Sequence, residues 1–401
     1  MLDAYIYDGA RTPFGKYCGA LAPVRPDDLA AGVIKALVER NGFDPALIDD
    51  VILGCACQSG EDSRNVARYA GLLAGLPIEV GGQTVNRLCG SSLAAIIDSA
   101  RAITCGEGEL FIAGGVESMT RAPLTFNKSG TAYSKDIKIY DSAIGVRFPN
   151  PEFGKQYGHD AMAVTADKVA TAGKVSRERC DQFAYHSQQK WAEATAKGYP
   201  AEEIVPVEIA QKRGKPPVLV EVDEHPRANP DRQKMAAMGT LFDDGVVTAA
   251  NASGINDGAS AVVVGSRQVG ENHGMKPLAR ILGGATAGVE PSMMGLGPVP
   301  ASQKLLKRLN LSLAQMDVIE LNEAFAAQVL GDLQQLGIAD DDARINPNGG
   351  AIAVGHPLGA SGARIALAAA RQLQRVGGRY ALISMCIGVG QGIAMVIERT
   401  E

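Results

Sequence analysis

Cys89 lies in the segment NRLCGSS (86–92), between a leucine and a run of glycine and serine. The next segment, LAAIIDSARAI (93–103), places apolar residues at spacings of three and four, the period of one helix face. Cys89 is therefore predicted to precede a helix N-terminus, where unpaired N–H groups and the helix dipole favour an anion. We expect its thiol to ionise more readily than a free cysteine and to attack carbonyl carbon. The alternative is a small buried apolar residue.

A cysteine nucleophile needs a base, and His356 in GGAIAVGHPLGASGAR (349–364) is the candidate. Glycines and Pro357 surround it, so its ring can be held at a turn with open space in front of it. A surface histidine in a turn is the alternative. The other four histidines stand in more polar, helical or loop-like contexts: His159, His186, His225 and His273.

A third segment, VIELNEAFAAQ (318–328), contains a polar pair where an apolar strand pattern is under way. Asn322 and Glu323 interrupt that strand, and we expect them to begin a helix that continues with Ala324 and Phe325. An N-cap role for Asn322 explains this position without any chemistry.

A fourth segment, ALISMCIGVGQGIAMVIE (381–398), carries a hydrophobic strand to Cys386 and then turns into another strand. The turn contains Gly388, Gly390 and Gly392. Glycines let the backbone approach a ligand closely and leave N–H groups free to face an oxyanion. A hairpin with a buried cysteine explains the turn, but not why three glycines recur at alternate positions.

Short β-like runs alternate with alanine-rich helical patterns along the chain, which indicates an α/β protein with sheets covered by helices. The runs expected to form strands are 3–9, 49–54, 109–115, 381–388 and 392–400.

The chain also repeats internally. IDDVILG (48–54) resembles MDVIELN (316–322), and aligning Asp50 with Asp317 gives an offset of 267 positions. The same offset carries Cys89 to His356, and both lie in Gly/Ser-rich turns followed by a helix pattern. Two duplicated βαβ-type halves related by an approximate two-fold axis would bring cysteine and histidine together.

A different composition begins near Arg121 and continues to about Ala250, richer in charge, proline and aromatic residues. We interpret this stretch as an inserted loop domain over the two halves, with helices within 160–170 and 177–198. The predicted organisation is an N-terminal half, the inserted domain, a return to the N-terminal half and a C-terminal half, with boundaries 1–120, 121–250, 251–273 and 274–401.

The composition argues against several classes of protein. The 39 basic and 44 acidic residues give a formal net charge of −5 without a charged block, which makes nucleic acid an unlikely partner. The seven cysteines are odd in number and form no CxxC pair, which fits a reducing compartment rather than a disulfide framework or a zinc site. Since neither a secretory signal nor 18 consecutive apolar residues occur, we expect a cytoplasmic protein without a membrane span or a metal site.

Four motifs in this order, NRLCGSS, LNEAFAAQ, GGAIAVGHPLGASGAR and CIGVGQG, closely resemble those of the thiolases. The resemblance covers nearly the whole chain and includes RTPFG (11–15), GGVESM (114–119) and NASGINDGA (251–259). It implies a thiolase fold and thiolytic cleavage of a 3-oxoacyl-CoA by coenzyme A, a co-substrate rather than a tightly bound cofactor. It also implies a homo-oligomer, a tetramer built as a dimer of dimers.

The resemblance assigns roles to the chemistry-bearing residues. In thiolases the Cys89 position attacks the 3-keto carbonyl, acetyl-CoA leaves as an enolate, and the shortened acyl group stays on sulfur. His356 would activate the nucleophile and hydrogen-bond the enolate oxygen, together with a water held by Asn322. Cys386 would protonate the enolate and deprotonate the incoming CoA, since a cysteine pKa can be tuned towards neutrality. The N–H groups of Cys89 and Gly388 would form an oxyanion hole for the thioester carbonyl.

The CoA moiety is expected on the inserted domain. By resemblance, Ser253 contacts the pantetheine and Arg227 lies beside the adenine. A turn serine and a solvated surface arginine are the alternatives. Four further residues fit positions that line the acyl and pantetheine tunnel: Met162, Met294, Ala324 and Phe325.

Two segments, EDSRNVAR (61–68) and IGVRFPNP (144–151), resemble the thiolases of aromatic-acid catabolism, which cleave 3-oxoadipyl-CoA. Ala161-Met162-Ala163 stands where acetoacetyl-CoA thiolases carry His-Met-Gly. The chain departs from the aromatic-acid subgroup at Val146, where tryptophan is frequent, and at Gly239-Thr240, where Lys/Arg-Pro is found. We expect 3-oxoadipyl-CoA as substrate, with Arg147 as a hypothetical partner of its terminal carboxylate.

Other functions stay open. A general 3-ketoacyl-CoA thiolase or an acetoacetyl-CoA thiolase would use the same catalytic motifs. A decarboxylating ketoacyl synthase would be expected to use two histidines and no second cysteine, so Cys386 and Asn322 favour a thiolase. The intact catalytic set argues against a non-catalytic acyl-CoA-binding protein.

Overall fold

The computed structural model describes residues 1–62, 64–211, 214–227 and 229–400, and its main feature is a ten-stranded mixed sheet. Its strands are β1 (Ala4–Arg11), β2 (Gly15–Lys16), β3 (Asp50–Gly54), β4 (Gly81–Val85), β5 (Leu110–Ser118), β10 (Asn256–Gly265), β11 (Ala279–Gly288), β12 (Val318–Leu321), β13 (Tyr380–Ile387) and β14 (Gln391–Arg399). They follow the order β12-β13-β14-β11-β1-β10-β5-β3-β4, with β2 beside β10. The five runs expected as strands form β1, β3, β5, β13 and β14, so those predictions are confirmed.

The sheet consists of two halves with the same pattern of strand directions. In the N-terminal half, β3 runs parallel to β5, and β5, β10 and β1 are antiparallel in turn. In the C-terminal half, β12 runs parallel to β13, and β13, β14 and β11 are antiparallel in turn. The halves join where β1 pairs with β11 through Ala4–Ile6. The predicted duplication is therefore confirmed.

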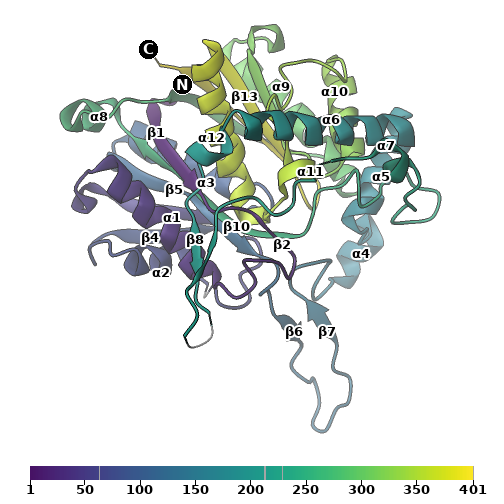
Figure 1. The fold of residues 1–401 in the computed structure, drawn as a ribbon. Coiled ribbons are helices and arrows are strands. Elements are labelled where there is room, and N and C mark those ends of the chain that lie inside the picture. Colours follow the sequence, from purple (N-terminus) through teal and green to yellow (C-terminus); the bar gives the residue numbers. More distant parts are fainter. Residues whose placement is uncertain (63, 212–213, 228, 401) are drawn as a thin grey trace.

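Two equivalent helices, α3 (Ser91–Cys105) and α12 (Leu358–Val376), begin 267 positions apart, at Ser91 and Leu358. Their backbones touch, because a Cβ added to Gly362 would lie 2.5 Å from the Leu93 nitrogen. The Ala363 N–H donates to Ser92 Oγ at 3.0 Å. The helix predicted after Cys89 is thus present, and its first turns contact the first turns of α12 (Figure 1).

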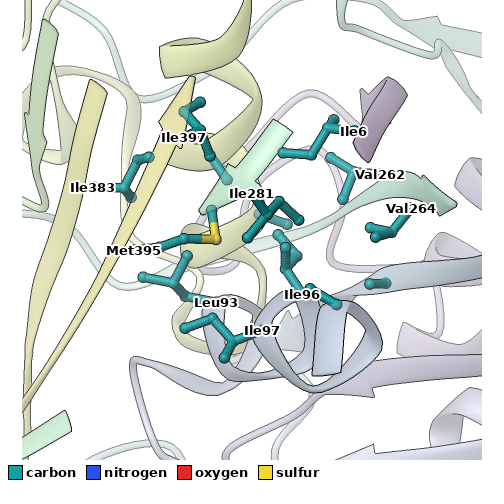
Figure 2. Packing of buried hydrophobic residues seen from close by; sticks show 14 of the residues in the cluster. Ile6, Leu93, Ile96, Ile97, Val262, Val264, Ile281, Ile383, Met395 and Ile397 are labelled. Atoms are coloured by element: carbon teal, nitrogen blue, oxygen red, sulfur yellow. The ribbon is translucent and has the colours of Figure 1, made fainter. Parts of the chain in front are cut away.

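A hydrophobic core shared by both halves surrounds α3 (Figure 2). The helix contributes Leu93, Ile96 and Ile97 to it. Strands of the N-terminal half contribute Ile6, Val262 and Val264, and strands of the C-terminal half contribute Ile281, Ile383, Met395 and Ile397. The stretch Leu88–Cys105 is long and apolar enough to cross a membrane, but 61% of it is buried inside the protein. Its apolar character therefore serves this core.

Helices also cover the opposite faces of the sheet. In β3, Ile52 faces the α3 core, whereas Val51 and Leu53 face a second core on the other side, as the strand period of two requires. The covering helices are α1 (Pro26–Asn41) and α2 (Val66–Leu73) on the N-terminal half, with α8 (Arg267–His273) nearby, and α9 (Pro298–Leu309) and α10 (Ala326–Leu336) on the C-terminal half. The expectation of an α/β fold with helix-covered sheets is confirmed.

In its described residues, the segment predicted as an inserted domain forms two small sheets and four α-helices outside the main sheet: β6 (Leu124–Phe126) with β7 (Ile139–Asp141), β8 (Val207–Ile209) with β9 (Val218–Val220), α4 (Pro151–Tyr157), α5 (Met162–Gly173), α6 (Arg177–Ala196) and α7 (Arg232–Ala236). Both helices expected in this segment are present as α5 and α6. Its buried residues pack mainly with the C-terminal half, while the β6–β7 arm projects away from the body (Figure 1). The exact domain boundaries stay predictions.

Candidate active site

Cys89 lies at the point where the chain leaves β4 and enters α3, and the residue as a whole is partly exposed although its sulfur is desolvated. Leu88 before it adopts a positive φ of 46°, a left-handed conformation that is costly for a branched residue. Two side chains stabilise this bend. Asn86 Oδ1 accepts the Leu88 N–H at 3.0 Å, and Ser91 Oγ accepts the Arg87 N–H at 2.9 Å. The backbone therefore presents the thiol at a sharp, well-supported corner.

Burial raises the pKa of the Cys89 thiol to about 11. This corrects the expectation of a readily ionised cysteine. The N–H groups of Gly388 and of Cys89 itself hydrogen-bond the sulfur and lower its pKa, but loss of solvent outweighs them. The resting nucleophile is a neutral thiol, and the two N–H groups are directed at the reacting sulfur, where they can stabilise negative charge.

His356 is buried in the short turn between α11 (Ala351–Val354) and α12. Its Nδ1 lies 2.6 Å from Ser361 Oγ, and that hydroxyl donates to Pro357 O at 2.9 Å. Because the hydroxyl proton is used on Pro357, Ser361 accepts from Nδ1–H, which leaves Nε2 unprotonated. Asn322 Nδ2 lies 3.4 Å from Nε2. Burial and then the nearby Arg364 charge lower the pKa of His356 to about 4, so the ring is neutral and Nε2 is available as a base.

Asn322 follows β12 and is fully buried, with its N–H donating to Ser384 O at 3.0 Å. The expected helix start at this residue is wrong, because α10 begins at Ala326 with Phe325 as N-cap. Phe325 is extended instead and forms a β-bridge with Ala252, and Ala324 O and Ala326 N–H hydrogen-bond the 251–253 segment on either side of it. Asn322 therefore does not cap a helix, and its Oδ1 has no hydrogen-bond partner among the described residues.

Cys386 is buried near the end of β13 and clusters with three residues predicted to line the tunnel: Met294, Ala324 and Phe325. Burial, and next the neighbouring Cys89, raise the pKa of Cys386 well above its ordinary value. The expected tuning of this pKa towards neutrality is therefore wrong for this state. A protonated thiol at this position can donate a proton.

Positions 388, 390 and 392 after Cys386 are occupied by glycine for different physical reasons. Gly388 leaves only limited space, since a Cβ there would crowd Leu88 at 3.3 Å and lie 3.8 Å from the Met162 sulfur. A Cβ on Gly390 or Gly392 would clash with the backbone around residues 289–298. Only Gly388 therefore adjoins the nucleophile, and the other two permit close packing of the hairpin.

The residues expected to bind CoA lie around this centre at different depths. Ser253 Oγ and N–H both donate to Ala324 O, at 3.1 and 3.0 Å, beside the cluster around Cys386. Met162 begins α5 and is 41% exposed, next to Gly388. Arg227 is partly exposed and donates to Ala249 O at 3.1 Å. Ser253 thus adjoins the cluster around Cys386 and Met162 adjoins Gly388, whereas Arg227 contacts Ala249.

Glu117, within the GGVESM motif, has a structural role that sequence reasoning missed. Its buried carboxylate accepts N–H groups from Ala56, Cys57 and Gly359, at 2.9, 3.0 and 2.9 Å. It thereby joins the loop after β3 to the first turn of α12, three residues after His356. Burial raises the pKa of Glu117 itself, and its charge raises the pKa of Cys89. The available signal was an acid in an otherwise apolar strand pattern.

Arg147 is partly buried in the loop before α4. Its guanidinium donates to Ser59 Oγ, to Cys57 O at 2.7 Å and to Ser142 O at 3.5 Å. No carboxylate lies within 4.0 Å of it among the described residues. Its partners are thus neutral, and they hold this loop against the N-terminal half.

No group of three His, Cys, Asp or Glu side chains positioned to hold a metal ion is found in the part of the chain that the structure describes. The site offers two thiols, one neutral imidazole, one amide and backbone N–H groups. This set suits acyl transfer through a cysteine.

Residues 4–268 match the family described as "Thiolase, N-terminal domain", and residues 275–399 match "Thiolase, C-terminal domain". The chain belongs to the thiolase family, and it is an acyltransferase that cleaves 3-oxoacyl-CoA by thiolysis.

The relatives narrow this class. Over 401 residues, covering both chains completely, the chain is 58% identical to a protein from Acinetobacter baylyi named beta-ketoadipyl-CoA thiolase. It is 56% identical over 403 residues, again covering both completely, to the 3-oxoadipyl-CoA/3-oxo-5,6-dehydrosuberyl-CoA thiolase of Escherichia coli. The crystal structure of human mitochondrial 3-ketoacyl-CoA thiolase in complex with CoA matches with a TM-score of 0.91 and 40% identity, covering 100% of this chain and 98% of that one.

Proposed function

We propose that this enzyme cleaves 3-oxoadipyl-CoA with CoA to give succinyl-CoA and acetyl-CoA. The observation that carries this substrate is the difference in whole-chain identity. It is 58% and 56% to proteins named for 3-oxoadipyl-CoA, against 40% to the human 3-ketoacyl-CoA thiolase. The CoA bound in that human structure supports CoA as the second substrate.

In the first half-reaction, His356 Nε2 takes the proton of the Cys89 thiol, and Sγ bonds to C3 of the substrate. The N–H groups of Cys89 and Gly388, which face the sulfur, receive the resulting oxyanion. When the C–O double bond re-forms, the C2–C3 bond breaks and its electron pair moves onto C2 and the thioester oxygen. This enolate oxygen accepts hydrogen bonds from His356 Nε2–H and from a water that also donates to Asn322 Oδ1.

Cys386 links the two half-reactions. Its thiol proton passes to C2 of the enolate, so acetyl-CoA leaves and a Cys386 thiolate remains. That thiolate takes the proton of the incoming CoA thiol, and the CoA sulfur attacks the acyl carbon on Cys89. Cys89 leaves with its electron pair and regains its proton from His356. The raised pKa of Cys386 makes its protonated form the resting acid and its thiolate a strong base.

The CoA moiety is proposed to run along Ser253 and Arg227, with the acyl end between Met162, Met294, Ala324 and Phe325. The support is positional. Ser253 contacts Ala324, and Met162 adjoins Gly388, so both adjoin the reacting centre. Arg227 lies near the surface, where an adenine can be solvated on one face.

A homotetramer, a dimer of dimers, is proposed as the assembly. β4 is an edge strand of the main sheet, and edge strands offer unpaired backbone groups to a partner. The projecting β6–β7 arm exposes Leu124, Phe126 and Ile139 by 66%, 67% and 65% of their surface. Sedimentation of a stable monomer would contradict the assembly. The seven free cysteines support the proposed cytoplasmic location.

The test of the substrate compares CoA-dependent cleavage of 3-oxoadipyl-CoA with that of 3-oxohexanoyl-CoA, a neutral chain of equal backbone length. A kcat/KM at least about 10-fold higher for the dicarboxyl substrate is expected, about 1.4 kcal/mol of discrimination. Equal or reversed preference would make the enzyme a general 3-ketoacyl-CoA thiolase. Arg147→Ala is the added variant: a similar loss on both substrates would leave Arg147 a loop anchor and no carboxylate partner.

A further inference from the structure

Asn256 is the first residue of β10 and is fully buried. Its Oδ1 accepts the backbone N–H of His356 at 2.9 Å. Its Nδ2 donates to Gly15 O at 2.9 Å. The side chain thus spans from the RTPFG segment near the N-terminus to the residue that we propose as the base, 100 positions further along the chain.

The Asn256 carboxamide lies in a slot between two glycines. A Cβ on Gly355 would come within 2.5 Å of Asn256 Cγ, and one on Gly254 within 2.9 Å of Oδ1. Gly355 also has a positive φ of 105°, which disfavours any side chain there. A side chain at either glycine would therefore crowd this amide, most of all at Gly355.

The orientation of the amide is defined by its two partners. Nδ2 must face Gly15 O, since a carbonyl only accepts, and Oδ1 must face the His356 N–H, since an N–H only donates. The pairing of β2 with β10 holds Gly15 in register with Asp257, next to Asn256. The contact to His356 is consequently rigid on both sides.

We propose that Asn256 is a positioning residue for the acyl transfer: it fixes the backbone of His356 so that Nε2 is directed at the nucleophile. This inference rests on the proposed role of His356. Ser361 holds the imidazole at Nδ1, and Asn256 holds the main chain of the same residue at N–H. Two fixed points define where Nε2 lies. A displacement of about 1 Å at a catalytic group can cost about 100-fold in rate.

Asn256→Ala is expected to lower kcat about 100-fold while KM for CoA changes less than about 2-fold, because Asn256 contacts His356 and not the CoA path. Asn256→Asp is the conservative rescue: burial favours its protonated carboxyl, whose O–H can donate to Gly15 O while the other oxygen accepts the His356 N–H. This variant is therefore expected to keep kcat within about 10-fold of the unmodified protein. Gly355→Ala places a Cβ against the Asn256 amide and should disturb its contact with His356, so it should reproduce the loss of kcat.

The matched control is Asn251→Ala. Asn251 is equally buried in the same segment, and its amide bonds Asp181, Val246 and Thr248 instead of His356. It is expected to lower the melting temperature while kcat stays within about 2-fold of the unmodified protein. If Asn256→Ala likewise lowers only the melting temperature and keeps kcat, the proposal is overturned.

His356→Ala separates this inference from the proposed function. If His356→Ala retains most of the activity, the assigned base is wrong and the function proposal fails with it. If His356→Ala loses activity and the Asn256 and Gly355 variants behave like Asn251→Ala, only the positioning role fails.

Discussion

Cys89 and His356 occupy equivalent places in the two duplicated halves, each just before a central helix, yet the protein holds them by different means. Cys89 is partly exposed and is placed by the bend at Leu88, which Asn86 and Ser91 support through the N–H groups of the two residues before Cys89. His356 is buried and is placed by side chains, Ser361 at the ring and Asn256 at the main chain. The nucleophile must admit a bulky acyl-CoA, whereas the base needs only a defined orientation. The two duplicated halves thus place Cys89 and His356 at similar bends before a helix. The surrounding side chains give the two residues different roles.

The pKa values of Cys89 and His356 shift in opposite directions. Burial raises the pKa of Cys89 to about 11 and lowers that of His356 to about 4. Both shifts favour the neutral forms. The pair therefore rests as a neutral thiol and a neutral imidazole. Charge appears only when the sulfur bonds to the substrate carbonyl, whose oxygen becomes an oxyanion.

The largest effect is expected from removing the nucleophile. Cys89→Ala should lower turnover by at least about 10⁴-fold, because no other group can carry the acyl chain. CoA binding, measured by calorimetry, should stay within about 2-fold of the unmodified protein. Cys105→Ala, at the exposed far end of α3, is the control and should retain activity. Turnover by Cys89→Ala would show that Cys89 is not the nucleophile.

The second effect tests the neutral resting pair. Alkylation of Cys89 by iodoacetamide should speed up about 10-fold per pH unit between pH 7 and 9, because the thiolate fraction rises towards its pKa of about 11. Mass spectrometry of the Cys89 peptide gives the rate. A rate that levels off below pH 7 would instead indicate a preformed thiolate–imidazolium pair.

A smaller effect is expected at the ring of the base. Ser361→Ala removes the acceptor of Nδ1–H, so the imidazole can rotate or change tautomer, and kcat should fall about 10-fold. Ser99→Ala is a matched control, since Ser99 makes the same kind of bond to the carbonyl four residues back, in α3. Equal kinetics for the two variants would show that the ring needs no such support.

The smallest effect on rate is expected at Glu117. Glu117→Gln places an NH₂ group against N–H donors, so the free energy of unfolding should fall by about 1–3 kcal/mol, measured by urea denaturation. The alkylation midpoint of Cys89 should move to lower pH, because the anion that raises its pKa is gone. Glu320→Gln is the control: burial raises the pKa of Glu320 to about 8, so it is already neutral at pH 7, and its oxygens have no partner among the described residues. If Glu117→Gln is as stable as the unmodified protein, Glu117 does not contribute to stability by joining the loop after β3 to α12.

The fold could be predicted largely from the sequence, since apolar periodicity reports strands and helices directly. The repeat offset located Cys89 and His356 at equivalent helix starts, and the structure has α3 and α12 there. The helix start predicted at Asn322 was wrong because the local pattern favours a helix, while pairing of Phe325 with the 251–253 segment delays the helix until Ala326. No local pattern contains that long-range pairing.

The parts of the site that could not be predicted depend on distant partners. Asn256 and Glu117 lie inside motifs that the sequence singles out, but they bond His356 and Gly359, 100 and 242 positions away. The direction of the Cys89 pKa shift likewise depends on desolvation by the folded protein, which outweighs the local helix dipole. Sequence thus indicates which segments matter, and packing decides what each side chain does.

The most direct measurement is the mass of the intact protein after mixing with 3-oxoadipyl-CoA in the absence of free CoA. We expect a succinyl adduct on Cys89 and release of acetyl-CoA, followed by loss of the adduct when CoA is added. Peptide mapping identifies the modified cysteine. No adduct, or an adduct on another of the seven cysteines, would contradict acyl transfer through Cys89.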